Sequence, residues 1–155
     1  MTTPRETKIL LVEDTEEHAL LMKRILEYGK LRPRLFWVTD GKAALDFLYN
    51  RGVYADRAAN PRPDIVLLDL KLPKVPGLKV LEQIKRDESL KDIPVAVLTA
   101  SDEAKDIVGS YRAGAESYVP KSVVFLNKGD EPGAILEAVV SLIGISDKEV
   151  VAHST

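Results

Sequence analysis

One short stretch, from Asp64 to Asp69, constrains the fold of this chain more than any other. Residues 65–68 form an unbroken apolar run that is rich in branched side chains and too short for a helix. Such a run predicts a strand buried on both faces, as in a parallel sheet. The proline and glycine that follow, Pro73 and Gly77, predict a loop. Asp69 therefore stands where open α/β sheets gather their ligands, unless it only caps the loop.

The rest of the chain alternates in the same way. Similar apolar runs predict four further strands, at residues 8–12, 35–38, 94–99 and 118–119. Apolar residues at helical spacing predict five helices, between residues 15 and 29, 40 and 48, 78 and 84, 102 and 113, and 134 and 143. A polar stretch from Asn50 to Pro63 predicts a long surface loop. We therefore expect an α/β protein with a flavodoxin-like, doubly wound, five-stranded parallel sheet in the order 2-1-3-4-5.

Length and composition exclude several classes of protein. The 155 residues suit one domain, which we expect at 8–143, with a disordered or extended segment at 1–7 and a tail at 144–155. A net charge of −2 gives no footprint for nucleic acid or for a membrane surface, and no run has the length of a membrane span. The absence of cysteine excludes disulfides and thiolate metal sites and fits a cytoplasmic protein. The tail is too short for a DNA-binding domain, so the output is expected through protein–protein contact.

Polar side chains follow the predicted strands at the points where each strand ends. Glu13 and Asp14 follow the first strand, Asp69 the third, Thr99 closes the fourth, and Lys121 lies near the end of the fifth. In a parallel sheet these ends share one edge, and strands one and three should be neighbours. Three carboxylates so close repel one another unless a cation compensates. An all-oxygen ligand set favours magnesium, with manganese as an alternative.

This set of residues is suited to phosphoryl transfer. The cation ligands would be Glu13, Asp14 and Asp69, directly or through water, with the backbone carbonyl of Lys71. Asp69 could act as a nucleophile and form an aspartyl-phosphate. Lys121 would then neutralise phosphoryl oxygens and Thr99 would donate a hydrogen bond to them. Each residue also has an ordinary explanation as a helix cap, a turn hydroxyl or a surface lysine, but four strand ends with matching polar groups favour the functional one.

These residues resemble a known family, the response-regulator receiver domain of two-component signalling, over residues 8–143. The pieces that carry the resemblance are the segments 9–14, 64–70 with Pro73 and Gly77, 94–100, and Tyr118 three residues before Lys121. The resemblance implies a single-domain response regulator that accepts a phosphoryl group from a histidine kinase in a magnesium-dependent reaction. It also implies that the protein catalyses its own phosphotransfer and autodephosphorylation, unlike a conventional enzyme.

The resemblance also assigns a role to each site residue: Asp69 as phospho-acceptor, Glu13 and Asp14 as metal acids, Thr99 as switch hydroxyl, Tyr118 as switch aromatic and Lys121 as phosphate-pairing lysine. Phosphorylation would remodel the surface of the fourth helix, fifth strand and fifth helix, through which many receivers dimerise. The apolar run from Val123 to Leu126 lies next to that surface and either joins it or closes the core.

The chain departs from the family pattern in two places. Pro120 precedes Lys121, and Ser122 stands where receivers usually carry a proline. The loop from Asn50 to Pro63 is longer than in most receivers. Both features are similar to the stand-alone regulators of bacterial and cyanobacterial phytochrome kinases, which implies a phytochrome as the kinase partner.

Three other functions fit the sequence less well. A pseudo-receiver, which is a binding module without phosphorylation, would lack an acid or the lysine, and this chain has all of them. A haloacid-dehalogenase-type phosphatase needs an acid two residues after its nucleophile, where this chain has Lys71. A flavin-binding flavodoxin-like protein needs a phosphate-binding loop after the first strand, where Glu13 and Asp14 would repel phosphate.

Overall fold

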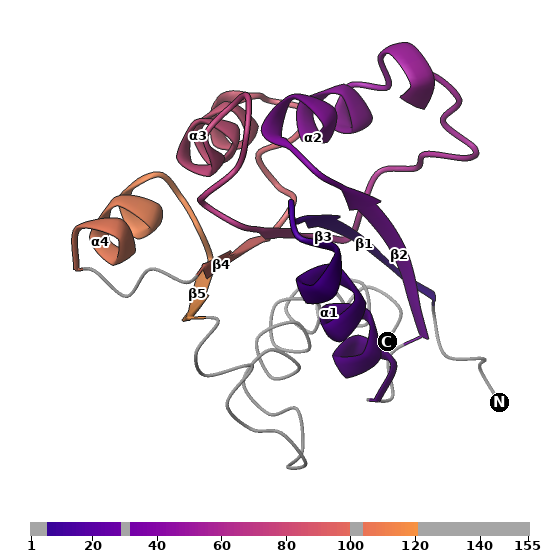
Figure 1. The fold of residues 1–155 in the computed structure, drawn as a ribbon. Helices are drawn as coiled ribbons and strands as arrows, with labels where there is room; N and C mark the ends of the chain where they lie inside the picture. Colours follow the sequence, from indigo (N-terminus) through magenta and orange to yellow (C-terminus); the bar gives the residue numbers. More distant parts are fainter. Residues whose placement is uncertain (1–5, 29–31, 100–103, 121–155) are drawn as a thin grey trace, which may run out of the picture.

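The computed structural model describes residues 6–28, 32–99 and 104–120 (Figure 1). In chain order the elements are β1 (Glu6–Val12), α1 (Glu16–Tyr28), β2 (Arg32–Val38), α2 (Gly41–Leu48), the 3₁₀ helix η1 (Gly52–Tyr54), β3 (Ile65–Leu68), α3 (Gly77–Arg86), β4 (Val95–Thr99), α4 (Ala104–Arg112) and β5 (Ser117–Pro120). The expected helix at 134–143, the apolar run at 123–126, Lys121 and the tail at 144–155 lie outside the described residues.

The five strands form one parallel sheet in the order β2-β1-β3-β4-β5. This confirms the order expected from the sequence. In the register of β1 with β3, Val12 pairs with Leu68, so the two strands end level with each other. In Figure 1, α2 and α3 lie on one side of the sheet and α1 lies on the other, so both faces are covered.

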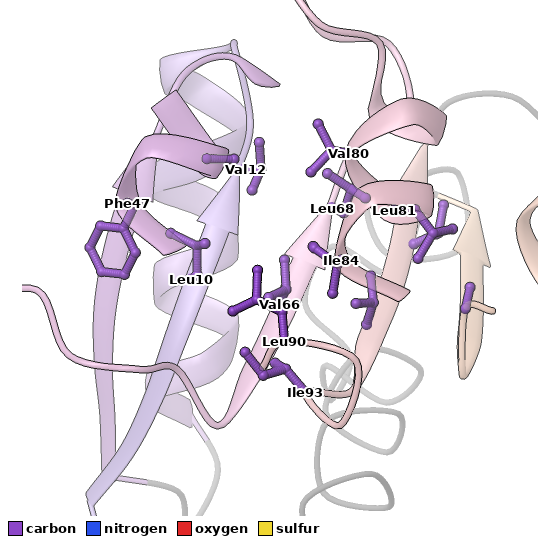
Figure 2. Close-up of a cluster of buried hydrophobic side chains, with 14 of the residues drawn as sticks. Leu10, Val12, Phe47, Val66, Leu68, Val80, Leu81, Ile84, Leu90 and Ile93 are labelled. Atoms are coloured by element: carbon purple, nitrogen blue, oxygen red, sulfur yellow. The ribbon is translucent and has the colours of Figure 1, made fainter. Parts of the chain in front are cut away.

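Successive residues of the central strands point alternately into two cores. Leu10, Val12, Val66 and Leu68 pack under α2 and α3. Their partners from this side are Phe47, Val80, Leu81, Ile84, Leu90 and Ile93, which Figure 2 labels. All four residues of β3 are inaccessible to solvent, and each such side chain contributes about 1.5–3 kcal/mol on burial. The unbroken apolar run is therefore the centre of the molecule, as the sequence predicted.

The opposite face of the sheet packs against α1. Three buried residues of this helix, Ala19, Met22 and Leu26, form one core cluster with residues of four strands. The strand residues are Ile9, Leu11, Ile65, Leu67, Ala96, Leu98 and Val119. The apolar residues at helical spacing in this segment also include Ile25, which is partly buried against the same core, and Leu20, which is 51% exposed and lies outside it. The prediction of α1 is therefore confirmed by its packing as well as by its bounds.

Three strands are longer than the sequence predicted: β5, which runs over Ser117–Pro120 and not 118–119 alone, and the first two strands at their amino ends. β1 begins at Glu6 and β2 at Arg32, and these extra residues pair with each other in register. β2 lies at an edge of the sheet, where a proline such as Pro33 is tolerated because one side of the strand needs no backbone N–H. A polar edge strand carries no apolar run, so its first residues gave no signal.

A partly buried lysine ties α3 to the strands that follow it. Lys85 Nζ donates hydrogen bonds to the carbonyl oxygens of Lys91 (3.0 Å) and Ile93 (2.8 Å), and it pairs with Glu116 Oε1 at 2.6 Å. The other carboxylate oxygen of Glu116 accepts the backbone N–H of Val95 at 2.6 Å. Only 13% of the Lys85 side chain is exposed, so this ion pair fastens the starts of β4 and β5 to α3.

Candidate functional site

The acids predicted from the strand ends lie together at one edge of the sheet. Glu13 and Asp14 follow β1, and Asp69 follows β3, its direct neighbour. Their carboxylate groups offer oxygen atoms that all lie within 4.8 Å of one another. Glu13 and Asp69 are buried, at 3% and 4% exposure, whereas Asp14 is exposed. Among the three acids, Asp14 is thus the one through which the cluster meets solvent.

Both backbone polar groups of Glu13, the N–H and the carbonyl oxygen, form hydrogen bonds with residues of β2. Its N–H donates to the carbonyl oxygen of Val38 at 3.0 Å, and its carbonyl oxygen accepts the indole N–H of Trp37 at 2.7 Å. The carboxylate oxygen Oε1 accepts the backbone N–H of Thr15 at 3.2 Å and lies 3.7 Å from His18 Nδ1. These contacts fix Glu13 before any ligand arrives.

Trp37 is a residue that sequence reasoning did not connect with the site. The side chain is 41% exposed, yet its one polar atom reaches across to the strand that carries the acids. The only signal in the sequence is the position of the single tryptophan at the second-last residue of a strand. The sequence does not give the register between β1 and β2, and it is this register that brings the indole beside the site.

Asp69 is oriented by the chain on either side of it. Its N–H donates to the carbonyl oxygen of Val12 at 3.1 Å, which continues the pairing of β3 with β1. Its carboxylate oxygen Oδ1 accepts the backbone N–H of Lys71 at 3.0 Å. This hydrogen bond closes a tight turn and sets the plane of the carboxylate. The Lys71 side chain is exposed, and the role of its carbonyl as a cation ligand stays a prediction.

The segment after Asp69 passes so close to α3 that only glycine fits. A Cβ on Gly77 would lie 2.2 Å from the carbonyl oxygen of Asp69 and 2.5 Å from the Cα of Leu70. The Gly77 N–H also donates to the carbonyl oxygen of Leu70 at 3.0 Å. The loop glycine of the sequence is therefore the first residue of α3, and its missing side chain lets the helix press on the backbone that carries Asp69.

The donor set fits a divalent cation. Three carboxylates supply only oxygen, which hard cations such as Mg²⁺, and also Mn²⁺, take as ligands. Two of these carboxylates are buried, and charges out of water need a compensating partner. A bound cation would meet this need for all three acids together.

The remaining predicted residues are placed only in part. β4 ends at Thr99, which pairs with Pro120 of β5, so both strands finish at the edge that carries the acids. The Tyr118 side chain is half-buried and packs against the core under α2 and α3. Lys121 follows β5 directly, and its position is outside the described residues. The roles of Thr99, Tyr118 and Lys121 therefore stay predictions.

Comparison with known proteins supports the resemblance. The sequence profile described as "Response regulator receiver domain" matches residues 9–126. The chain is 45% identical over 117 residues to the "Probable methanogenesis regulatory protein FilR2" of Methanothrix harundinacea, covering 76% of this chain and 73% of that protein. It is 41% identical over 114 residues to "Response regulator Rcp1" of Synechocystis sp., covering 74% of this chain and 76% of Rcp1.

Solved structures give the same result. The crystal structure of the Mn²⁺-bound form of Rcp1 has a TM-score of 0.71 at 39% identity and covers 78% of this chain and 85% of that one. The phosphorylated cyanobacterial phytochrome response regulator RcpA has a TM-score of 0.71 at 34% identity and covers 92% of this chain and 93% of that one. Within the described ranges of our structure, no helix is both long and apolar enough to cross a membrane.

Proposed function

We propose a phosphoryl-accepting function, because this chain belongs to the response regulator receiver domain family. Asp69 takes a phosphoryl group from the phosphohistidine of a histidine kinase, and the reaction depends on a divalent cation, Mg²⁺ in the cell. The observation that carries this proposal is the meeting of Glu13, Asp14 and Asp69, with carboxylate oxygens within 4.8 Å. Two separate segments of the chain supply these acids.

In the proposed reaction, a carboxylate oxygen of Asp69 forms a bond to phosphorus while the bond from phosphorus to the histidine nitrogen breaks. The electron pair of the broken bond stays on the imidazole nitrogen of the kinase, which takes a proton from solvent. The hydrogen bond from the Lys71 amide keeps the Asp69 carboxylate in one orientation during the attack. Glu13 and Asp14 would hold the cation, which supplies positive charge for the phosphoryl oxygens. Lys121 adds a second positive charge and the Thr99 hydroxyl a hydrogen bond.

The kinase partner is proposed from the relatives. Rcp1 and RcpA are response regulators, and RcpA is described as a phytochrome response regulator, so we assign a phytochrome-type histidine kinase to this chain. The similarity to FilR2 makes a direct comparison necessary. A phosphotransfer assay against a panel of purified histidine kinases tests the assignment. Transfer from a phytochrome kinase should be the fastest, and equal rates from unrelated kinases would contradict it.

The output is proposed to be a change at the surface of α4 and β5. Phosphorylation draws the Thr99 hydroxyl inward, and Tyr118 follows. Val108 and Tyr111 of α4 are 48% and 51% exposed, so this surface already offers apolar area to a second copy of the chain. Sedimentation with and without beryllofluoride tests a phosphorylation-driven homodimer, and an unchanged mass would count against it.

The central test is the mass of the intact protein after incubation with acetyl phosphate and Mg²⁺. A labile gain of one phosphoryl group is expected in the wild type, and it should be lost with EDTA and in Asp69→Asn. Asp64→Asn is the matched control, because Asp64 stands at the other end of β3 and accepts the backbone N–H of Lys8 at 2.8 Å. This variant should still gain the mass. A gain that survives Asp69→Asn would move the acceptor elsewhere, and no gain from any donor would favour a pseudo-receiver.

A further inference from the structure

The long segment between α2 and β3 has no part in the proposed reaction, yet it is well organised. Asn50, at a φ of 53°, donates from its side-chain amide to the carbonyl oxygens of Tyr54 (3.0 Å) and Asn60 (2.9 Å). The carboxylate of Asp56 accepts the backbone N–H of Ala58 at 2.9 Å. The hydrogen bonds of Asn50 connect the start of the segment to residues 54 and 60, so they hold its backbone in one conformation.

This segment forms one wall of a pocket of about 310 Å³, which we call the loop pocket. The turn before β4 forms the other wall, with Ser89, Leu90 and Ile93 among its lining residues. The loop pocket thus lies near the amino ends of β3 and β4, at the opposite edge of the sheet from the acids. Pro63, which lines the pocket, precedes Asp69 by six residues along β3, a separation of roughly 20 Å at about 3.3 Å per residue.

The floor of the loop pocket is apolar and its rim is basic. Pro63, Leu90 and Ile93 are buried side chains that line it, and Figure 2 shows Leu90 and Ile93 at the end of the core beside Val66. Arg57 and Arg62 line it from the exposed side. Its described lining residues include two arginines and no acid, so the pocket favours a ligand with both negative charge and apolar surface.

The two arginines differ in how they are held. A guanidinium N–H of Arg62 donates to the backbone carbonyl of Ser89, which connects the two walls. Arg57 has neither an ion pair nor a hydrogen bond from its side chain among the described residues. An arginine carries five N–H donors and pairs with a carboxylate through two of them. Both residues therefore keep donors for an incoming anion.

Among the described residues, neither of the acids nearest in sequence to the pocket lining, Asp56 and Asp87, forms an ion pair with Arg57 or Arg62. Asp56 is engaged by the turn of its own loop. The Asp87 carboxylate accepts the Ser89 hydroxyl at 2.6 Å and the Tyr49 hydroxyl at 2.5 Å. These hydrogen bonds, that of Ser89 first, lower the pKa of Asp87 from 3.8 to about 2, so it stays ionised but is turned toward its own partners.

We infer that the loop pocket binds an acidic peptide segment of a partner protein, with an apolar side chain on the floor and flanking carboxylates on Arg57 and Arg62. Arginine beside a buried apolar patch is the usual make-up of a protein–protein contact centre. No aromatic side chain is among the described lining residues, so a nucleic-acid base would find nothing to stack on. Because the pocket is remote from Asp69, the partner stays docked through phosphorylation and dephosphorylation.

The test is a titration of the ¹⁵N-labelled full chain with the peptide acetyl-Glu-Leu-Glu-amide, followed by amide chemical shifts. Saturable shifts are expected in the loop and in the turn at Ser89, with an affinity of about a millimolar, since only a small area is buried. Acetyl-Gln-Leu-Gln-amide and acetyl-Glu-Gly-Glu-amide, which lack the charge or the apolar side chain, should each bind more weakly. Inorganic phosphate that binds as well as the peptide would overturn the assignment in favour of a simple ion site.

Two substitutions test whether the peptide binds at the loop pocket. Arg57→Gln should weaken the peptide about three- to tenfold without loss of folding, because the exposed side chain has no partner in the described structure. Arg24→Gln on α1 removes the same charge on the other face of the sheet and should bind like the wild type. Equal binding by all three proteins, or an absence of shifts in the loop, would refute the inference. Neither result depends on whether Asp69 is phosphorylated.

Discussion

Substitution of Gly77 by alanine tests how the fold positions Asp69. The added Cβ would meet three backbone atoms of the preceding segment: the Asp69 carbonyl oxygen at 2.2 Å, the Leu70 Cα at 2.5 Å and the Leu70 carbonyl oxygen at 2.9 Å. No real Cβ contact is that short, and backbone atoms cannot move aside as a flexible side chain can. The helix and the Asp69 segment must therefore separate.

The expected cost is a net loss of about 2 kcal/mol in the free energy of unfolding. Overpacking costs about 1–3 kcal/mol, and a clash with three backbone atoms, one of them at 2.2 Å, belongs at the upper end of that range, while alanine returns at most about 1 kcal/mol in helix propensity. A loss of about 2 kcal/mol in a chain of this size lowers Tm by about 4–8 °C. The displaced Asp69 should also accept phosphate from acetyl phosphate more slowly, by up to about a hundredfold for a shift of about 1 Å.

Gly109→Ala is the matched control. Gly109 lies inside α4, and the nearest atom to an added Cβ is the Leu78 Cδ2 at 4.0 Å. This substitution should stabilise the protein by about 0.5–1 kcal/mol and leave the phosphorylation rate unchanged. Urea denaturation and intact-mass kinetics measure both effects. If Gly77→Ala unfolds at the wild-type midpoint and is phosphorylated at the wild-type rate, the packing of α3 on the Asp69 segment is not what positions the acceptor.

Three further outcomes are expected. Lys85→Met should lower the free energy of unfolding, measured in urea, by about 2–3 kcal/mol, because the Glu116 carboxylate and the carbonyl oxygens of Lys91 and Ile93 lose their ammonium partner. The control Lys79→Met, on the exposed side of α3, should cost less than about 0.5 kcal/mol. Trp37→Phe should weaken Mg²⁺ binding about tenfold by calorimetry with little change in Tm, because it removes a hydrogen bond behind a cation ligand, and unchanged affinity would refute that role. Ser89→Ala should reduce stability near neutral pH, and its difference from the wild type should vanish as pH falls from about 4 to about 2, where Asp87 protonates in the folded state; a difference that persists below that window would contradict the linkage.

The sheet and the acid cluster were predictable because each depends on one-dimensional signals. Buried parallel strands appear as apolar runs, and the run from Ile65 to Leu68 marks the centre. Once the order 2-1-3-4-5 is assumed, Val12 and Leu68 must end side by side, and the acids after them must meet. The spatial expectation for Glu13, Asp14 and Asp69 followed from topology alone.

Other features depend on register and on loop conformation, which leave no pattern in the sequence. The bond from Trp37 to the Glu13 carbonyl exists because the two strands pair in one particular register. The clamp between Lys85 and Glu116 joins residues 31 positions apart, with no periodicity to link them. The polar sequence after Asn50 predicts only a surface loop, whereas internal hydrogen bonds order this segment as one wall of a pocket.

The most direct test of the account is a Mn²⁺ titration followed by the electron paramagnetic resonance of the free ion. The wild type should bind one Mn²⁺ in competition with Mg²⁺, and Glu13→Gln and Asp69→Asn should each weaken that binding at least about tenfold, because their carboxylates come from different segments but share one cation. Asp64→Asn, at the far end of β3, should bind like the wild type. Tight binding of Mn²⁺ that survives both Glu13→Gln and Asp69→Asn would contradict the shared site.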